Sequence, residues 1–211
     1  MTPTQARDHV CSLATADTEA ALQVARGIDD PWFACQALAW AARFAPDERV
    51  EAIVAEALTV GHRHADPYKV VGSTAWPIRA LVERGRTNRI APILEEMLDR
   101  VPRIEPPAGR SEAVFLLFQA VFPAGRNWWA RVLDVLIAVS DPGTHWRQAR
   151  NTRDALLMVA EEDPGFAADC ANRLSNKRNR RRIEQCLSRH DTQTRRPFFW
   201  KPDSPYAGEP G

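Results

Sequence analysis

The residues best suited to metal coordination lie in one short stretch, 61–66, which reads GHRHAD. It places His62, His64 and Asp66 at alternate positions, and imidazole and carboxylate groups are common zinc ligands. Residues two apart on a helix point in different directions, so these three could converge only in a loop. No other His or Cys has a spacing that would complete the set. We therefore expect an exposed loop between helices and no metal site.

The familiar motifs of catalysis and nucleotide binding are missing from the sequence. It contains no Gly-x-Ser-x-Gly turn, no His-Glu-x-x-His and no glycine-rich phosphate loop. The ten glycines are scattered through predicted turns. No Cys and His are singled out by spacing as a nucleophile and its base. We expect a non-enzymatic protein that uses no cofactor.

Basic residues gather near the C-terminal end, although the whole chain has a net charge of only +1. Nine Lys and Arg residues lie between 173 and 196, against the two acids Glu184 and Asp191. A run of this kind can contact nucleic-acid phosphates. The alternative, which we favour, is a charged helix that covers the end of a helical stack. The cations of the densest run are Lys177, Arg178, Arg180, Arg181 and Arg182.

Tryptophan is frequent, with seven in the chain, and several stand near arginine. Adjacent helical residues point about 100° apart, so Trp128 and Trp129 cannot both face one core. Trp129 continues an apolar stripe, whereas Trp128 lies on the flank of its helix. Trp and Arg dominate binding hot spots, so off-stripe Trp–Arg pairs predict a partner-binding groove. The alternative is that these flanks pack on neighbouring helices. The residues are Trp76, Arg79, Trp128, Arg131, Trp146 and Arg150.

The elements that position these side chains are helices, because the clearest local signals mark helix starts. Asp-Pro occurs at 30–31, 66–67, 141–142 and 163–164. An Asp accepts hydrogen bonds from first-turn N–H groups, and the Pro supplies a helical φ where no N–H is needed. We predict that the pairs at 30, 66 and 141 open long helices and that the pair at 163 opens a helix after a tight turn. Pro106-Pro107 stands where a further Asp-Pro would be expected.

Apolar stripes with helical spacing recur about every forty residues. Nothing alternates with period two over a strand length, so we expect no sheet. The stripes are Val50, Ile53, Val54, Ala57 and Leu58, then Ile90, Ile93, Leu94, Met97 and Leu98, then Trp129, Val132, Leu133, Leu136 and Ile137. The predicted helices are 4–14, 18–27, 31–45, 47–61, 67–84, 88–101, 110–122, 126–139, 144–161, 164–174 and 177–189. The helix over 111–122 is apolar nearly all round, which predicts a central position.

The run at 21–58, ALQVARGIDDPWFACQALAWAARFAPDERVEAIVAEAL, resembles bacterial α-solenoid repeats of the HEAT-like and tetratricopeptide-like kind. The shared pattern is Ala-x-x-Ile-x-Asp-Pro-x-x-x-Ala-x-Ala-Leu. The resemblance is best over 20–62, extends over 66–101 and weakens over 106–174; the tetratricopeptide signature Trp-x-x-Leu-Gly is absent. It implies an all-α fold, an α-solenoid of about five antiparallel helix pairs in a right-handed superhelix. We expect one domain over 1–190.

The resemblance also implies two classes of partner. Such scaffolds bind proteins or, less often, nucleic acid along a concave surface, and some HEAT-like proteins are DNA glycosylases that use an Asp beside Trp. Trp128, Arg131 and Asp134 are similar to that combination, but they form no motif, and an Asp on an exposed helix face is normally solvated. Protein binding is the leading hypothesis. Nucleic-acid binding, with or without base chemistry, is the alternative.

The cysteines and the apolar runs indicate where the protein works. The four cysteines contain no C-x-x-C pair, and Cys35, Cys170 and Cys186 fall on apolar sides of predicted helices, as thiols do in a reducing compartment. The longest apolar run, 113–118, is too short to span a membrane. The first twenty residues lack the apolar core of a secretory signal. We expect a cytoplasmic protein.

The last segment, 191–211, reads as an extended tail, because it has prolines at 197, 202, 205 and 210. Its aromatic content is too high for an inert linker. We expect the aromatic side chains to dock onto the helical domain, and partner binding is the alternative. They are Phe198, Phe199, Trp200 and Tyr206.

Overall fold

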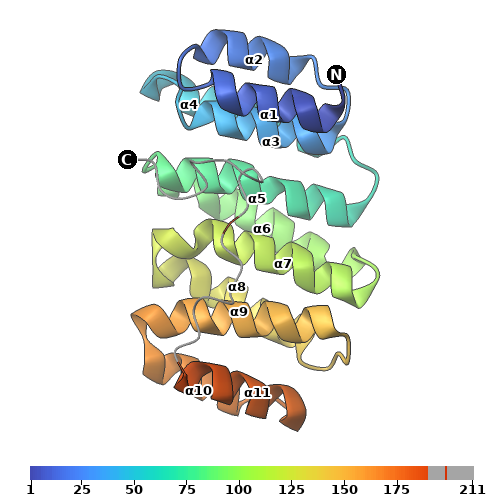
Figure 1. The fold of residues 1–211 in the computed structure, drawn as a ribbon, viewed down its shortest axis with the longest axis vertical. Helices are drawn as coiled ribbons and strands as arrows, with labels where there is room; N and C mark the ends of the chain where they lie inside the picture. Colours follow the sequence, from blue (N-terminus) through green and yellow to red (C-terminus); the bar gives the residue numbers. More distant parts are fainter. Residues whose placement is uncertain (190–197, 199–211) are drawn as a thin grey trace.

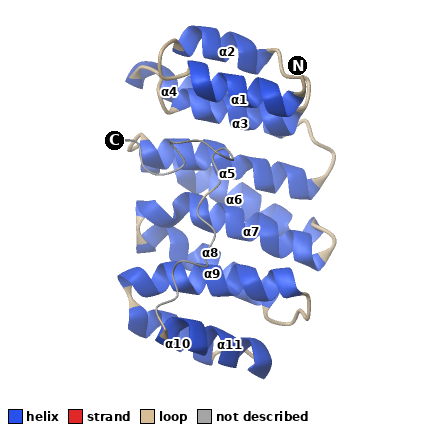
Figure 2. Ribbon diagram, viewed as in Figure 1, coloured by secondary structure: helices blue, strands red, loops and turns tan. Residues whose placement is uncertain are grey.

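The protein is all-helical over the part that the structure describes, residues 1–189 and residue 198 of a computed structural model. Within that part it forms eleven α-helices and three short 3-10 turns and no strand (Figure 2). The all-α class and the number of helices were predicted correctly. The helices are α1 (Pro3–Leu13), α2 (Thr18–Arg26), α3 (Pro31–Ala42), α4 (Asp47–Gly61), α5 (Pro67–Glu83), α6 (Ile90–Arg100), α7 (Pro107–Val121), α8 (Arg126–Ser140), α9 (Trp146–Glu162), α10 (Pro164–Asn172) and α11 (Lys177–Ser188). The 3-10 turns are Thr87–Arg89, Val101–Arg103 and Phe122–Ala124.

The odd-numbered helices from α1 to α9 pack one against the next, and each packs against the even-numbered helix that follows it. Figure 1 shows α5, α7 and α9 side by side at the front, with α6 and α8 behind them. Helix α11 closes one end of the molecule by packing on α9 and α10. No described helix combines the length and apolar composition that a bilayer crossing requires.

The predicted stripes face the interior. The buried members are Val50, Ile53, Val54 and Ala57 of α4, Ile90, Leu94, Met97 and Leu98 of α6, and Trp129, Val132, Leu133 and Leu136 of α8. Leu58, Ile93 and Ile137 are only partly buried and pack at the edge of the core. Burying one such side chain stabilises the fold by about 1.5–3 kcal/mol. These stripes therefore hold the even-numbered helices to the layer that α1, α3, α5, α7 and α9 form, which we call the odd layer. Helix α7 contacts α5, α8 and α9, which explains why its sequence is apolar nearly all round.

Three of the four Asp-Pro helix starts are confirmed. The carboxylate of Asp30 accepts a hydrogen bond from the Trp32 N–H at 2.8 Å, and that of Asp66 accepts one from the Tyr68 N–H at 2.9 Å. Asp163 caps α10 in the same way, by accepting a hydrogen bond from the N–H of Phe166 at 2.9 Å. Helix α7 begins at Pro107 without a side-chain cap.

The prediction that Asp141 opens a helix at 144 is wrong. Asp141 ends α8, and α9 begins at Trp146, where His145 Nδ1 accepts a hydrogen bond from the Arg147 N–H at 3.2 Å. The Asp141 carboxylate instead accepts hydrogen bonds from the N–H groups of Ser175 at 2.8 Å and Asn176 at 3.2 Å. It therefore ties the turn before α11 to the end of α8.

The four cysteines are free thiols. Cys11, Cys35 and Cys170 are buried and Cys186 is partly buried, as expected for small core residues. Of the C-terminal aromatic residues, Phe198 packs against the helical domain, which agrees with the predicted docking. The predictions for Phe199, Trp200 and Tyr206 lie outside the described residues.

Candidate functional site

Trp146, the first residue of α9, is an exposed indole between two arginines. It is 58% exposed, and with Met1 it makes up the exposed large hydrophobic side chains of the described part. The guanidinium carbon of Arg150 lies 4.7 Å from the centroid of the indole ring, and that of Arg147 lies 5.5 Å away. The His145 ring stacks against the indole at 5.8 Å. These contacts hold the ring in place without removing it from solvent.

The position of this group follows from how α9 starts. Because His145 caps α9, Trp146 and Arg147 fall in the first turn of this helix, and their side chains lie at its N-terminal end. Arg150 is four residues after Trp146 and therefore lies on the same side of the helix. The N-terminal end of a helix carries a partial positive charge, and two arginines add to it. This surface should attract a carboxylate or another anionic group.

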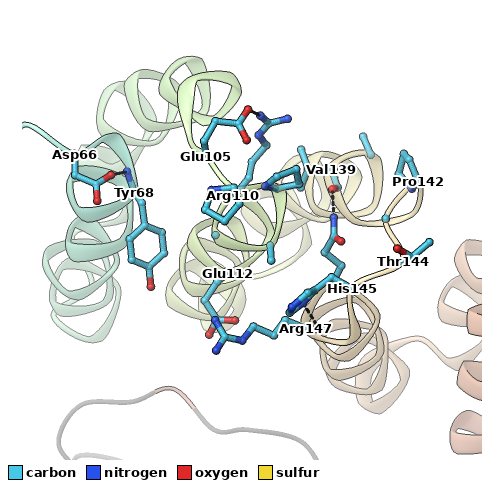
Figure 3. Close-up of a pocket in the computed structure, with 17 residues that line it drawn as sticks. Asp66, Tyr68, Glu105, Arg110, Glu112, Val139, Pro142, Thr144, His145 and Arg147 are labelled. Atoms are coloured by element: carbon cyan, nitrogen blue, oxygen red, sulfur yellow. Dashed lines mark hydrogen bonds and ion pairs between the residues drawn. The ribbon is translucent and has the colours of Figure 1, made fainter.

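A cavity of about 950 Å³ lies next to this surface, between the starts of α5, α7 and α9 (Figure 3). In Figure 3 the side chains of Glu112 and Arg147 point toward one another below the cavity. Arg110 is held at the opposite side by the Ile104 carbonyl at 3.0 Å and by Glu105 at 2.9 Å. The charged and aromatic residues of the lining are Asp66, Tyr68, Glu105, Arg110, Glu112, His145 and Arg147.

The cavity is suited to binding through hydrogen bonds and charge. Burial raises the pKa of Tyr68, the charge of Glu112 raises it further, and Arg147 acts in the opposite direction. The phenol therefore stays protonated at neutral pH and can donate or accept a hydrogen bond. The lining offers charges of both signs, which favours a ligand with separate cationic and anionic groups over a simple anion.

Tyr68 connects the cavity to a row of packed aromatic rings, which we call the aromatic row: Tyr68, Trp32, Trp76 and Phe198. Tyr68 stacks on Trp32, with ring centroids 6.1 Å apart. The ring of Trp32 meets that of Trp76 edge-on at 5.6 Å, and Trp76 meets Phe198 at 5.8 Å. The row joins residues of α3 and α5 to a residue from beyond α11.

The six predicted partner-binding residues do not form one face. Trp76 is only 2% exposed, because it packs between Trp32 and Phe198, so its prediction as an accessible groove residue is wrong. Arg79, also on α5, donates hydrogen bonds to Glu83 Oε1 at 2.6 Å and to the Gln119 carbonyl at 3.3 Å.

The two candidates on α8 are separated from those on α9. Trp128 is partly buried against the core. This agrees with the alternative prediction, in which the flank of this helix packs on neighbouring helices. Arg131 of α8 pairs with Glu95 of α6. Asp134, which also lies on α8, is exposed. Of the predicted set, the structure brings together the exposed Trp146 and the partly buried Arg150, and leaves the α8 pair in the other layer.

The sequence reasoning missed three residues of the site, namely Trp32, Tyr68 and Glu112. A signal for two of them was present. Trp32 and Tyr68 each follow a capping Asp by two residues, so they occupy equivalent places at the starts of neighbouring parallel helices. Glu112 lacks such a signal, because its proximity to Arg147 depends on how α7 and α9 pack.

The other stretches singled out in the sequence give a mixed result. His62 lies 3.7 Å from Glu96, Asp66 is occupied as a cap, and burial lowers the pKa of His64. Within residues 1–189 and residue 198, no three possible metal ligands come together. In the basic run, Arg180 pairs with Glu184 at 3.8 Å and donates to the Asn172 carbonyl at 3.2 Å. The remaining cations, Lys177, Arg178, Arg181 and Arg182, are exposed on α11.

Comparisons of the chain with protein-family models, with curated proteins and with solved structures gave no match. Its function must therefore be inferred from the chemistry and geometry of its own residues.

Proposed function

We propose that this protein is an α-solenoid scaffold that binds another protein, rather than catalysing a reaction, and that the partner docks at the start of α9. The serial packing of α1, α3, α5, α7 and α9 supports the first part of this proposal. In helical-repeat proteins each helix pair buries its apolar face against the next pair, and the open side serves as an extended binding surface.

The observation that carries the binding role is the exposure of Trp146 between Arg147 and Arg150. An indole held by two guanidinium groups on a rigid helix loses little entropy when a partner covers it. The cavity beside it accepts a side chain from the partner. A partner segment that combines an apolar side chain with a carboxylate fits this chemistry. Its apolar side chain packs on the Trp146 ring, and its carboxylate pairs with Arg147 and Arg150.

The test compares two tryptophans of different helix layers. Full-length protein carries a photo-crosslinker, captured proteins are identified by mass spectrometry, and each purified candidate is titrated by calorimetry. We expect Trp146→Ala to weaken binding of the true partner by about 30-fold, equivalent to about 2 kcal/mol at a hot spot. The matched variant Trp128→Ala should change the affinity less than 3-fold. A partner that loses affinity with Trp128→Ala and keeps it with Trp146→Ala would move the site to α8.

Nucleic-acid binding through α11 is the second candidate. Lys177, Arg178, Arg181 and Arg182 are exposed on one side of the helix, because at 3.6 residues per turn they span about 140° of its circumference. Such a row can follow a phosphate backbone.

Fluorescence anisotropy with duplex and single-stranded DNA at several salt concentrations tests this second candidate. If it holds, the log–log salt slope should fall by about 2 in the double variant Arg181→Ala/Arg182→Ala, about 1 for each phosphate that is no longer neutralised. Arg89→Ala, which removes a cation paired with Glu51, is the control. An equal loss of DNA affinity in both variants would indicate a general charge effect and not a site on α11.

A further inference from the structure

Phe198 lies in a pocket on the odd-helix layer, far along the chain from the residues that form it. Its side chain is 8% exposed. The ring centroid lies 5.8 Å from that of Trp76, and the guanidinium carbon of Arg79 lies 5.3 Å from the same phenyl centroid. The phenyl ring is therefore held by an indole and a cation that both come from α5. We call these two residues and the space between them the Trp76–Arg79 pocket.

Contacts that do not involve Phe198 fix the cation of this pocket. Arg79 donates from Nε to Glu83 Oε1 at 2.6 Å and from a terminal nitrogen to the Gln119 carbonyl of α7 at 3.3 Å. Glu83 is itself held by Arg43, the residue that follows α3, whose Nε lies 2.5 Å from the other carboxylate oxygen. Three neighbouring helices thus set the position of one guanidinium group.

The indole is fixed in the same way. Trp32 of α3 meets the ring of Trp76 edge-on at 5.6 Å. Trp32 can approach this closely because residue 72 is a glycine, and a Cβ at that position would lie 3.1 Å from the Trp32 ring. The pocket is therefore built by α3, α5 and α7, and these contacts among its walls do not involve Phe198.

The chemistry of the walls selects an aromatic side chain. A cation over a ring face and an indole against the ring are both favourable for a phenyl or phenol group. An aliphatic side chain would bury similar area but would lose both of these interactions. An aromatic anchor on an extended segment is a common basis of peptide recognition by preformed pockets.

We propose that the Trp76–Arg79 pocket is a recognition site for an aromatic side chain on an extended segment of a partner protein, and that Phe198 occupies it as an internal competitor. The observation that supports this occupant is Phe198 itself, which shows that the pocket accepts a phenyl ring. While Phe198 is docked, the pocket cannot bind a partner side chain. The apparent affinity for the partner therefore equals the intrinsic affinity multiplied by the fraction of molecules in which the pocket is empty. The inference does not depend on Trp146 or on the proposed partner surface of α9.

The experiment measures binding of a peptide in trans. The probe is a fluorescein-labelled synthetic peptide with the sequence of residues 194–204, TRRPFFWKPDS, and the proteins are the full-length chain and its Phe198→Ala variant. Anisotropy should show that Phe198→Ala binds the probe at least 10-fold more tightly than the unmodified protein does. A probe in which Ala replaces Phe198 should bind the variant at least 10-fold more weakly. Equal binding of both probes by the folded variant would overturn the proposal.

Two further proteins distinguish binding in the pocket from binding at the α9 surface. Adding Arg79→Ala to Phe198→Ala should remove the gained affinity, whereas adding Trp146→Ala should leave it within 2-fold. Loss with Trp146→Ala and retention with Arg79→Ala would place the probe at the α9 surface and overturn the assignment. Circular dichroism and thermal melting establish that each protein is folded. If Phe198→Ala is unfolded, Phe198→Leu takes its place, because leucine keeps the apolar contact and loses the ring over Arg79; the same gain over the unmodified protein is then required.

Discussion

The thiol of Cys35 lies 3.5 Å from the backbone carbonyl oxygen of Ser73, where α3 packs against α5. In an α-helix the N–H of residue 77 would donate to that carbonyl, but residue 77 is a proline and has no N–H. Burial raises the pKa of Cys35 to about 12, so the thiol keeps its proton and can donate it. A side chain of α3 thus partly replaces the bond that α5 lacks.

Cys35→Ala should lower the free energy of unfolding by about 1–2 kcal/mol, because it removes a donor from a buried carbonyl and leaves a small cavity. Pro77→Ala restores the backbone N–H, so Cys35→Ala should cost less in that background. Urea unfolding of the four proteins of this double-mutant cycle gives the coupling energy, which we expect to exceed about 0.5 kcal/mol. Additive effects would show that the thiol and the proline are independent.

The helix starts show which part of this fold is readable from the sequence. Asp30, Asp66 and Asp163 cap helices because the N–H groups that they accept from are two or three residues away, so the signal is local. Asp141 carries the same Asp-Pro signal, yet its carboxylate binds N–H groups 34 and 35 residues further along the chain. A carboxylate can cap the helix that follows it, or it can bind a turn that is distant in sequence. A local pattern cannot distinguish these two roles, because it carries no information on which turn packs beside the carboxylate.

The tryptophans of the candidate site show the same difference between what local sequence predicts and what long-range packing decides. The 100° rotation between adjacent residues was enough to separate Trp129 in the core from Trp128 on the flank. The same reasoning predicted that Trp76 lies off the apolar side of its helix, in an accessible groove, but Trp76 is buried. Its neighbours Trp32 and Phe198 lie 44 and 122 residues away in sequence, and periodicity within one helix carries no information about them.

Trp128 and Trp129 provide a matched pair for measuring this difference. Trp129 is buried against Phe118, Phe122 and Phe166, with ring centroids 5.7–6.3 Å away. Trp129→Ala should therefore lower the free energy of unfolding by about 3–5 kcal/mol. Trp128→Ala, which truncates a partly exposed ring, should cost about 1 kcal/mol. Chemical denaturation monitored by circular dichroism compares them, and similar costs would contradict the assigned core.

Asp141 should make the attachment of α11 sensitive to acid. Burial acts to raise the pKa of Asp141, but hydrogen bonds from Ser175 and Asn176 outweigh it and hold the pKa below its usual range. A depressed pKa in the folded state stabilises the fold above the unfolded-state value near 4, and this stabilisation is lost as the pH falls through the folded value. The protection of amide hydrogens over 173–188, after correction for the intrinsic pH dependence of exchange, should be lower at pH 3 than at pH 6. In Asp141→Asn this protection should already be lower at pH 6 and should change less with pH; an unchanged acid response in this variant would show that a group other than Asp141 is responsible.

Glu83 is a largely buried charge of the odd layer, and its one carboxylate, with 7% side-chain exposure, pairs with both Arg43 and Arg79. Burial lowers the pKa of Arg43, and the charge of Glu83 partly offsets that effect. Glu83→Ala should therefore cost about 3–5 kcal/mol, since it leaves two largely desolvated cations facing each other. Glu56→Ala is the matched control, because Glu56 pairs with Arg26 at 2.8 Å on an exposed surface where such pairs contribute at most about 1 kcal/mol. Equal costs in urea unfolding would mean that the Glu83 cluster behaves as a surface pair; a large difference would show that the guanidinium facing Phe198 is held in place by the carboxylate behind it.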